Sequence, residues 1–333
     1  MSTRVVQLQR GQERRVALVD EPRLRLLDAA SSVYGFAHTA ISTSDSLVHL
    51  VAHCVSDESI PYDDVYEGRS DWRLLSPIDH PSEPSRLLVS GTGLTHLGSA
   101  ANRQSMHEMK ESELTDSMKM FRWGVEGGRP PSGEVGISPE WFYKGNGTIL
   151  RGHNEPLVIP PFAEDGGEEA EIAGVYIIAD DGRPFRIGMA NGNEFSDHKY
   201  EQRNYLNLAS SKIRTCSLGP ELVIDAGFDS VSGTASIIRD GTTIWCKDIV
   251  TGESDMCHSL QNVEHHHFKF ESHRRPGDVH IHYFGACSLS FGEVELRDGD
   301  VMDVRFEGFG RPLRNPLAVD HAANSLFTVQ SLA

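Results

Sequence analysis

Residues 163–178, AEDGGEEAEIAGVYII, place three glutamates at the start of an apolar run that is typical of a β-strand. Glu169 and Glu171 are two positions apart, and on a strand such side chains point to the same face, roughly 6–7 Å apart. Two carboxylates at that spacing repel each other unless a cation lies between them. Oxygen ligands suit Mg²⁺, Mn²⁺ or Ca²⁺ better than Zn²⁺. By itself the pair indicates either a divalent-metal site or a solvent-facing acidic strand.

The sequence that follows favours the metal site. The segment ADDGR (179–183) is a hairpin signal, so the chain is expected to return toward the end of the sheet where the two glutamates lie. There Glu194, in a Gly/Asn-rich turn, would add a third carboxylate. Lys212 follows 18 residues later, where it would bind a substrate oxygen or transfer a proton, although a lysine considered alone is more often a surface residue.

The composition excludes several classes of protein. The chain has 333 residues with a net charge of −17, which argues against nucleic acid or an anionic membrane as the main partner. The N-terminus lacks the apolar region of a signal peptide, and no stretch approaches the ~20 apolar residues that span a membrane. Five widely spaced cysteines without a CxxC pair fit reduced thiols. We expect a cytoplasmic protein.

The pattern of apolar residues predicts an α+β fold with a large mixed β-sheet body and a smaller N-terminal α/β cap. We expect two strands within residues 4–20, two helices within 23–55, and a polar, proline-rich link over 57–85. Short apolar runs punctuated by glycine and proline follow, interrupted by helical segments at 99–125 and 197–212. Because no alternating βαβ pattern occurs, a doubly wound sheet is disfavoured. The predicted domains are a cap over 1–80 and a catalytic domain over 86–333.

Five motifs in order resemble the fumarylacetoacetate hydrolase superfamily across residues 86–318, and this resemblance implies the same fold. The motifs are SPEWFYKGNGTILRGHNEPLVIPP (138–161), EEAEIAGVYI (168–177), MANGNEFSDHKYE (189–201), YLNLASSK (205–212) with CSLGP (216–220), and the C-terminal run RPGDVHIHYFGACSLSFGEVELRDGDVMDVRFEGFGRPLRNPL (275–317).

Three departures from the family pattern bear on the activity. The third metal ligand, usually Asp in the family, is Glu194 here, and the substrate loop Gly-Thr-Pro reads Gly-Ala-Cys-Ser at 285–288. The segment that carries the water-activating His/Glu pair of the hydrolases lacks its Asn-Tyr here, and His96 lies one position out of register. The chain is therefore more similar to the sugar-acid dehydratase branch, which acts on 2-keto-3-deoxy aldonic acids.

The resemblance implies a metal-dependent hydro-lyase that dehydrates 2-keto-3-deoxypentonate to 2-oxoglutarate semialdehyde through a metal-stabilised enolate. The alternative is a C–C bond hydrolase of an acylpyruvate or 2,4-diketo acid on the same metal site. An oxaloacetate decarboxylase or tautomerase and a catalytically silent binding protein also stay open. The implied cofactor is Mg²⁺ or Mn²⁺, the implied partner is a small-molecule 2-keto acid, and family members are commonly homodimers.

The implied residues fall into three groups. The metal ligands are Glu169, Glu171 and Glu194. The acid/base residues are Glu108, with His107 and Glu111 beside it on a lid over about 103–135, together with Lys212. The substrate-binding residues are Lys212, Ser196, Gly285 and Ser288.

Two other features are interpreted as structural. The run His265-His266-His267, read as a strand, would point its side chains to alternate faces, so the three could not converge on one metal ion. Cys287 lies in the substrate loop, but no histidine or acid is spaced to activate it, so we expect a packing role.

Overall fold

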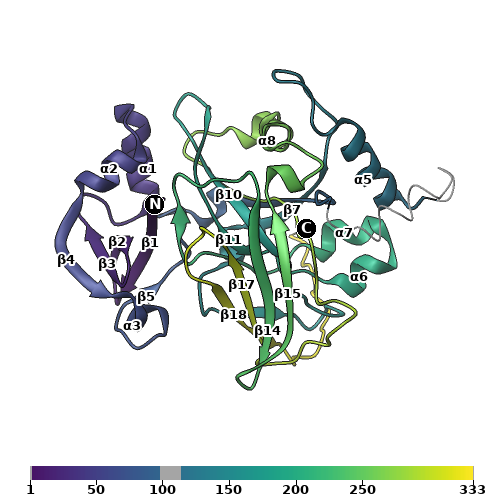
Figure 1. Ribbon diagram of the computed structural model, residues 1–333. Coiled ribbons are helices and arrows are strands. Elements are labelled where there is room, and N and C mark those ends of the chain that lie inside the picture. The colour runs from purple at the N-terminus through teal and green to yellow at the C-terminus, as the bar shows by residue number, and fades with distance from the viewer. Residues whose placement is uncertain (1, 98–113, 333) are drawn as a thin grey trace.

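The structure is a computed structural model that describes residues 2–97 and 114–332. The N-terminal region forms one end of the molecule, drawn in purple in Figure 1. It consists of β1 (Arg4–Arg10), β2 (Glu13–Asp20), β3 (Arg23–Leu27), α1 (Val33–Thr43), α2 (Leu47–His53), β4 (Val55–Pro61), α3 (Tyr62–Tyr66) and β5 (Arg73–Leu74).

A 13-stranded sheet joins this region to the rest of the chain, because β1 pairs with β13. Its main path runs β4-β3-β2-β1-β13-β11-β10-β16-β6-β7, with β5, β8 and β12 off that path. The strands beyond the N-terminal region are β6 (Leu87–Gly93), β7 (Glu140–Asn146), β8 (Leu150–Arg151), β10 (Ala170–Ile178), β11 (Pro184–Asn193), β12 (Cys216–Leu218), β13 (Leu222–Val223) and β16 (Val279–Tyr283).

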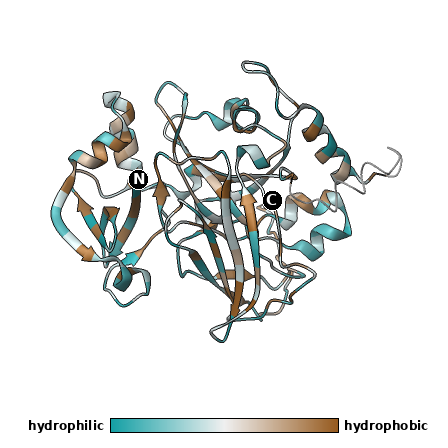
Figure 2. Cartoon of the chain, viewed as in Figure 1, coloured by the Kyte–Doolittle hydropathy of each residue, from teal (hydrophilic) through white to brown (hydrophobic). Residues whose placement is uncertain are grey.

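A second, five-stranded sheet packs against the first in the order β15-β14-β17-β18-β9. Its strands are β9 (Leu157–Ile159), β14 (Val231–Arg239), β15 (Thr242–Thr251), β17 (Val301–Phe306) and β18 (Leu313–Val319). Ile172 and Met189 of the large sheet share one buried apolar cluster with Ala235 and Val304 of the small sheet. Figure 2 shows the hydrophobic stretches along the strands in the middle of the molecule. The predicted α+β architecture is confirmed.

The remaining helices lie around this β body. They are α5 (Asp116–Gly127), α6 (His198–Arg203), α7 (Leu208–Ser211) and α8 (Leu260–Phe268), with short 3₁₀ turns at Pro84–Arg86, Gly147–Ile149, Tyr205–Asn207, Glu253–Asp255 and Glu271–His273. In Figure 1, α5, α6 and α7 lie together at the end opposite the N-terminal region. No helix in the described part of the chain is both long enough and apolar enough to span a bilayer.

The structure corrects the sequence interpretation near the N-terminus. Residues 23–27, expected in the first helix, form β3, in which Leu24 and Leu26 alternate with polar residues and are buried. Residues 55–61, which overlap the expected link, form β4. This strand is polar because it is an edge strand that pairs only with β3.

The histidine run was also misassigned. His265, His266 and His267 lie on helix α8, which Ser259 caps by accepting a hydrogen bond from the Asn262 backbone N–H at 3.2 Å. His267 is buried against β16, where its Nε2 lies 2.9 Å from His280 Nδ1, and His282 Nδ1 lies 2.8 Å from Ser90 Oγ. His267, His280 and His282 form a buried hydrogen-bonded cluster with Ser90, so the structural interpretation of the histidine run stands although the predicted strand was wrong.

This cluster makes stability depend on pH. Burial, together with the neighbouring histidines, lowers the pKa of both His280 and His282 to about 3, below the ~6.5 of an unfolded chain. Between those two values the unfolded chain binds more protons than the folded one, so stability falls as the pH falls. From pH 6 to pH 4, the free energy of unfolding of the wild type should fall more steeply than that of His280→Gln, by about 1.4 kcal/mol per pH unit.

Urea denaturation across that pH range measures the two slopes. The exposed His265 lies on α8, and His265→Gln serves as the matched control that should keep the wild-type slope. Equal slopes for the wild type and His280→Gln would contradict the prediction.

Candidate metal centre

The hairpin of β10 and β11 brings the predicted ligands together. Glu171 pairs with Gly192 in the antiparallel register, and the backbone N–H of Glu194 donates to the carbonyl oxygen of Glu169 at 2.9 Å. Carboxylate oxygens of Glu169, Glu171 and Glu194 all lie within 4.8 Å of one another, and all three residues are buried. Among the described residues no other group of His, Cys, Asp and Glu has such a geometry. Three oxygen donors in one buried volume fit a hard divalent cation.

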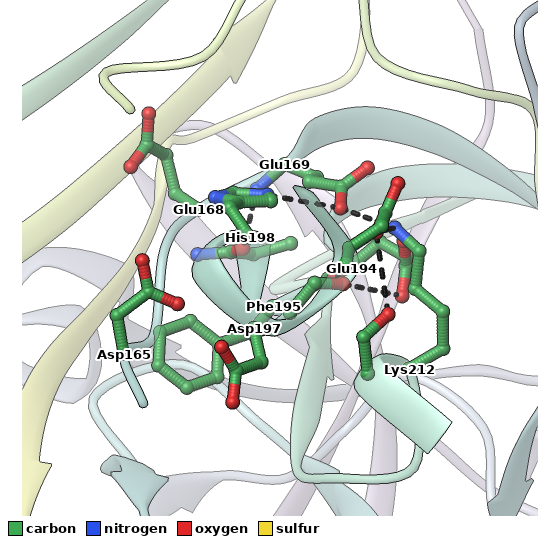
Figure 3. Close-up of polar contacts among 12 residues, drawn as sticks. Asp165, Glu168, Glu169, Glu194, Phe195, Asp197, His198 and Lys212 are labelled. Atoms are coloured by element: carbon green, nitrogen blue, oxygen red, sulfur yellow. Dashed lines mark hydrogen bonds and ion pairs between the residues drawn. The ribbon is translucent and has the colours of Figure 1, made fainter. Parts of the chain in front are cut away.

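Glu168 is separate from this cluster, as strand alternation predicts. Its two carboxylate oxygens accept hydrogen bonds from the backbone N–H and from Oγ of Ser290, each at 2.6 Å. Figure 3 shows the Glu168 side chain directed away from Glu194 and Lys212. Both carboxylate oxygens of Glu168 therefore have a hydrogen-bond donor without a cation.

Lys212 lies against the glutamate cluster. It is buried at the C-terminal end of α7, and its Nζ donates to Glu169 Oε1 and, at 2.8 Å, to Glu194 Oε2 (Figure 3). His198 Nε2 lies 3.1 Å from the same oxygen of Glu169. The structure thus places Lys212 beside the glutamates and buries it, while its role in the site stays a prediction.

Crowding of the carboxylates separates their pKa values. Burial, then Glu194 and Glu169, raise the pKa of Glu171 well above its ordinary value. Burial and Glu169 also raise the pKa of Glu194, although Lys144 and Lys212 lower it in part. For Glu169, burial is outweighed by Lys212 and His198, so its pKa is lowered. Full ionisation of all three carboxylates is therefore disfavoured in the metal-free cluster, and a bound cation would offset both the burial and the mutual repulsion of the charges.

The predicted substrate loop contacts the same cluster. The backbone N–H of Gly285 donates to Glu171 Oε2 at 2.6 Å. Gly285 has φ 102°, and a Cβ at this position would lie 2.2 Å from Thr95 Oγ1. Only glycine fits there, because both the backbone angle and the available space exclude a side chain.

A cavity of about 470 Å³ opens beside the cluster. The described residues that line it are Gly93, Leu94, His96, Ser117, Met118, Phe121, Glu140, Glu169, His198, Glu201, Leu208, Lys212, Ala286, Cys287, Ser288 and Leu289. Such a volume suits a small-molecule ligand. Polar groups lie near the glutamates, and several large apolar side chains complete the wall.

The predicted site residues are placed in different ways. Glu169, Lys212 and Ser288 line the cavity, and Glu171 and Glu194 are buried beside Glu169. Ser196 is not among the lining residues: its hydroxyl donates to the Glu194 carbonyl at 2.8 Å and lies 3.2 Å from Glu194 Oε1. The predicted acid/base residues His107, Glu108 and Glu111 lie outside the described residues.

Sequence reasoning missed Glu140. It begins β7 opposite Gly93, is 8% exposed and lines the cavity. A Cβ on Gly93 would lie 1.8 Å from Glu140 Oε2, so the glycine makes room for the carboxyl group. Burial raises the pKa of Glu140 to about 7, although Lys212 and a hydrogen bond from Tyr205 lower it in part. The signal was present in the alternation of Glu140, Phe142 and Lys144, which places a carboxyl group on a buried face.

The raised pKa of Glu140 means that this residue should lower the free energy of unfolding at high pH. Its pKa rises from 4.5 in the unfolded chain to about 7 on folding, so the folded state binds more protons in that range and loses stability as the pH rises through it. Glu140→Gln should therefore be more stable than the wild type at pH 8, by about 3 kcal/mol, with the difference shrinking toward pH 4.

Chemical denaturation at the two pH values gives this difference. The exposed Glu307 provides the control Glu307→Gln, whose effect should be small at either pH. A stability difference between Glu140→Gln and the wild type that does not change with pH would refute the prediction.

Comparisons with known proteins agree on the fold. No protein-family model matches the sequence, and no curated protein is significantly similar to it. Among solved structures, the apo form of 2-keto-3-deoxy-D-arabinonate dehydratase matches with a TM-score of 0.71 and 18% identity, over 96% of this chain and 100% of that one. The same enzyme complexed with magnesium and 2,5-dioxopentanoate matches with a TM-score of 0.70, 18% identity and the same coverage of both chains.

A third structure, 5-carboxymethyl-2-hydroxymuconate delta-isomerase from Mycobacterium smegmatis, matches with a TM-score of 0.57 and 18% identity, over 95% of this chain and 100% of that one. These similarities confirm the fold that the sequence motifs predicted. The chain has the α+β fold of 2-keto-3-deoxy-D-arabinonate dehydratase and of 5-carboxymethyl-2-hydroxymuconate delta-isomerase.

Proposed function

We propose that this protein is a divalent-metal-dependent hydro-lyase that dehydrates a 2-keto-3-deoxy sugar acid, 2-keto-3-deoxypentonate, to 2-oxoglutarate semialdehyde. The observation that carries the proposal is the buried cluster of Glu169, Glu171 and Glu194 beside a cavity whose wall holds Lys212 and Glu140. A carboxyl group with a pKa near neutrality and an ammonium group beside a metal site supply what proton removal next to a ketone requires.

The three glutamates would hold Mg²⁺ or Mn²⁺. Their oxygens lie close together, and the raised pKa values of Glu171 and Glu194 show that the metal-free cluster disfavours full ionisation. A divalent cation bound there would polarise the ketone of a 2-keto acid and stabilise the negative charge that develops on its oxygen.

The cavity residues supply the proton transfers. Glu140, whose pKa is about 7, accepts a proton from C3 of the substrate as the C3–H bond breaks, and Lys212 donates hydrogen bonds to a substrate oxygen. The C4–O bond then breaks, a C3–C4 double bond forms, and the departing hydroxide takes up a proton to leave as water. A proton then moves from C5 to C3 and the double bond shifts to C4–C5, giving an enol; loss of the enol hydroxyl proton and protonation at C4 give the aldehyde at C5. The sequence-predicted residues Glu108, His107 and Glu111 stay candidates for the second acid/base role.

The structural comparison supports this choice of substrate. The similar dehydratase was solved with magnesium and 2,5-dioxopentanoate, and that compound is 2-oxoglutarate semialdehyde. The isomerase with the same fold indicates that this fold carries related chemistry on other keto acids, so the substrate has to be tested directly. The division into a cap over 1–80 and a catalytic domain over 86–333, the homodimer and the cytoplasmic location are likewise proposals.

Metal binding by the glutamates is testable without a substrate. The wild type should bind Mg²⁺ in an isothermal titration. Replacing a ligand, as in Glu169→Gln, Glu171→Gln or Glu194→Gln, should weaken binding by more than about 100-fold, since loss of an outer-shell partner alone costs roughly 10–100-fold.

Glu168→Gln is the matched control, because Glu168 is bonded to Ser290 and lies outside the cluster. It should leave Mg²⁺ affinity unchanged. An unaltered Mg²⁺ affinity in Glu169→Gln would rule out the proposed site.

The reaction is distinguished by its product. With Mg²⁺ and 2-keto-3-deoxypentonate, the enzyme should form an aldehyde, detected by an aldehyde dehydrogenase coupled to NAD⁺ reduction, and Glu140→Gln should lower kcat by about 100-fold or more. Release of pyruvate from an acylpyruvate, without aldehyde formation from any 2-keto-3-deoxypentonate, would support the hydrolase alternative and sink the dehydratase proposal.

A further inference from the structure

A second lysine, Lys144, is buried next to the glutamate cluster. It lies on β7 and is 0% exposed. Its Nζ lies 2.5 Å from Glu194 Oε1 and donates to the carbonyl oxygens of Phe195 at 2.6 Å and Lys212 at 3.0 Å. The three acceptors match the three N–H donors of an ammonium group. A buried lysine is costly unless it is fully paired in this way.

These contacts join three separate segments. Lys144 comes from β7, Glu194 and Phe195 belong to the turn after β11, and Lys212 ends α7. The turn carries the proposed third metal ligand, and α7 positions the lysine that lines the cavity. One ammonium group therefore fixes Glu194 and the backbone of Lys212 relative to each other.

Lys144 also distinguishes the two oxygens of Glu194. Oε1 is held by Lys144 and lies 3.2 Å from Ser196 Oγ, and both of those residues are fully buried. Oε2 contacts Lys212, which lines the cavity. A glutamate side chain has three rotatable bonds, so a ligand of this type needs outer contacts that fix its orientation.

We propose that Lys144 is a positioning residue that holds Glu194 by Oε1 so that Oε2 is presented to the divalent cation. The inference rests on the proposed function, because it requires Glu194 to be a ligand. It also assigns different tasks to the two buried lysines. Lys144 orients the ligand and is not among the residues that line the cavity, whereas Lys212 lines the cavity, where it can contact substrate.

The test compares two substitutions that separate orientation from charge. Lys144→Met removes both the donors and the charge, whereas Lys144→Gln removes the charge and keeps an N–H donor. If Lys144 acts by orienting Glu194, Met should weaken Mg²⁺ binding by roughly 10–100-fold and Gln should restore part of that loss. Lys247 of β15 is 43% exposed and paired with Glu293, so Lys247→Met is the control for removing one positive charge from the surface.

The probe is Mg²⁺ alone, titrated calorimetrically into each metal-free variant, with urea unfolding measured in parallel to verify that each variant is folded. Tighter Mg²⁺ binding in both Lys144 variants would show that the lysine acts by repelling the cation and would overturn the inference. Unchanged Mg²⁺ affinity in a folded Lys144→Met variant would also overturn the inference about Lys144. In that case, loss of Mg²⁺ binding in Glu169→Gln would still support the metal site itself. If the wild type binds no Mg²⁺, the proposed function and this inference both fail.

Discussion

The carboxylates of Glu169, Glu171 and Glu194 share one buried volume, and like charges held so close in a low-dielectric interior repel strongly. Much of the local structure serves to hold them there. The register of the β10–β11 hairpin places Glu194 beside Glu169, and the Gly285 N–H donates to Glu171. Without such constraints the side chains would turn apart toward water, and the cluster would be lost.

Compensating charges come from segments far apart in sequence. Lys144 reaches the cluster from β7, Lys212 from α7, and His198 from the start of α6. The two packed sheets keep these segments in place, since their shared apolar core includes the strands that carry or flank the glutamates. Buried ionised groups contribute little net stability, so the proposed metal site accounts for this concentration of them better than folding does.

Much of this arrangement follows from local sequence patterns. The Glu-x-Glu spacing, the ADDGR hairpin and the later lysine depend on strand periodicity and turn chemistry, which act over a few residues. For that reason the sequence could predict a cluster of Glu169, Glu171, Glu194 and Lys212, and the structure places these side chains next to one another, while their roles stay predictions. The same alternation puts Glu168, the neighbour of Glu169, on the opposite face, where its carboxylate accepts hydrogen bonds from Ser290.

Features that depend on tertiary context were harder to predict. The sequence of β4 resembles that of a polar linker, because β4 is an edge strand that is paired on one side only. His267 of α8 is buried by packing against β16, which the composition of the helix does not indicate. Glu140 differs from a surface glutamate only through its burial beside Gly93 and Lys212. Both of these residues are distant from Glu140 in the sequence, so local patterns do not reveal the contacts. Ser196 was expected to bind substrate, but its hydroxyl bonds to Glu194.

The proposed function depends on a divalent cation that binds between the three glutamates. The most direct measurement is the anomalous scattering of Mn²⁺ in crystals of the protein grown with MnCl₂. The account predicts one strong peak within coordination distance of Glu169, Glu171 and Glu194, at roughly 2.0–2.3 Å from their oxygens. A peak elsewhere, or no peak while Lys212 stays bonded to Glu169 and Glu194, would contradict it.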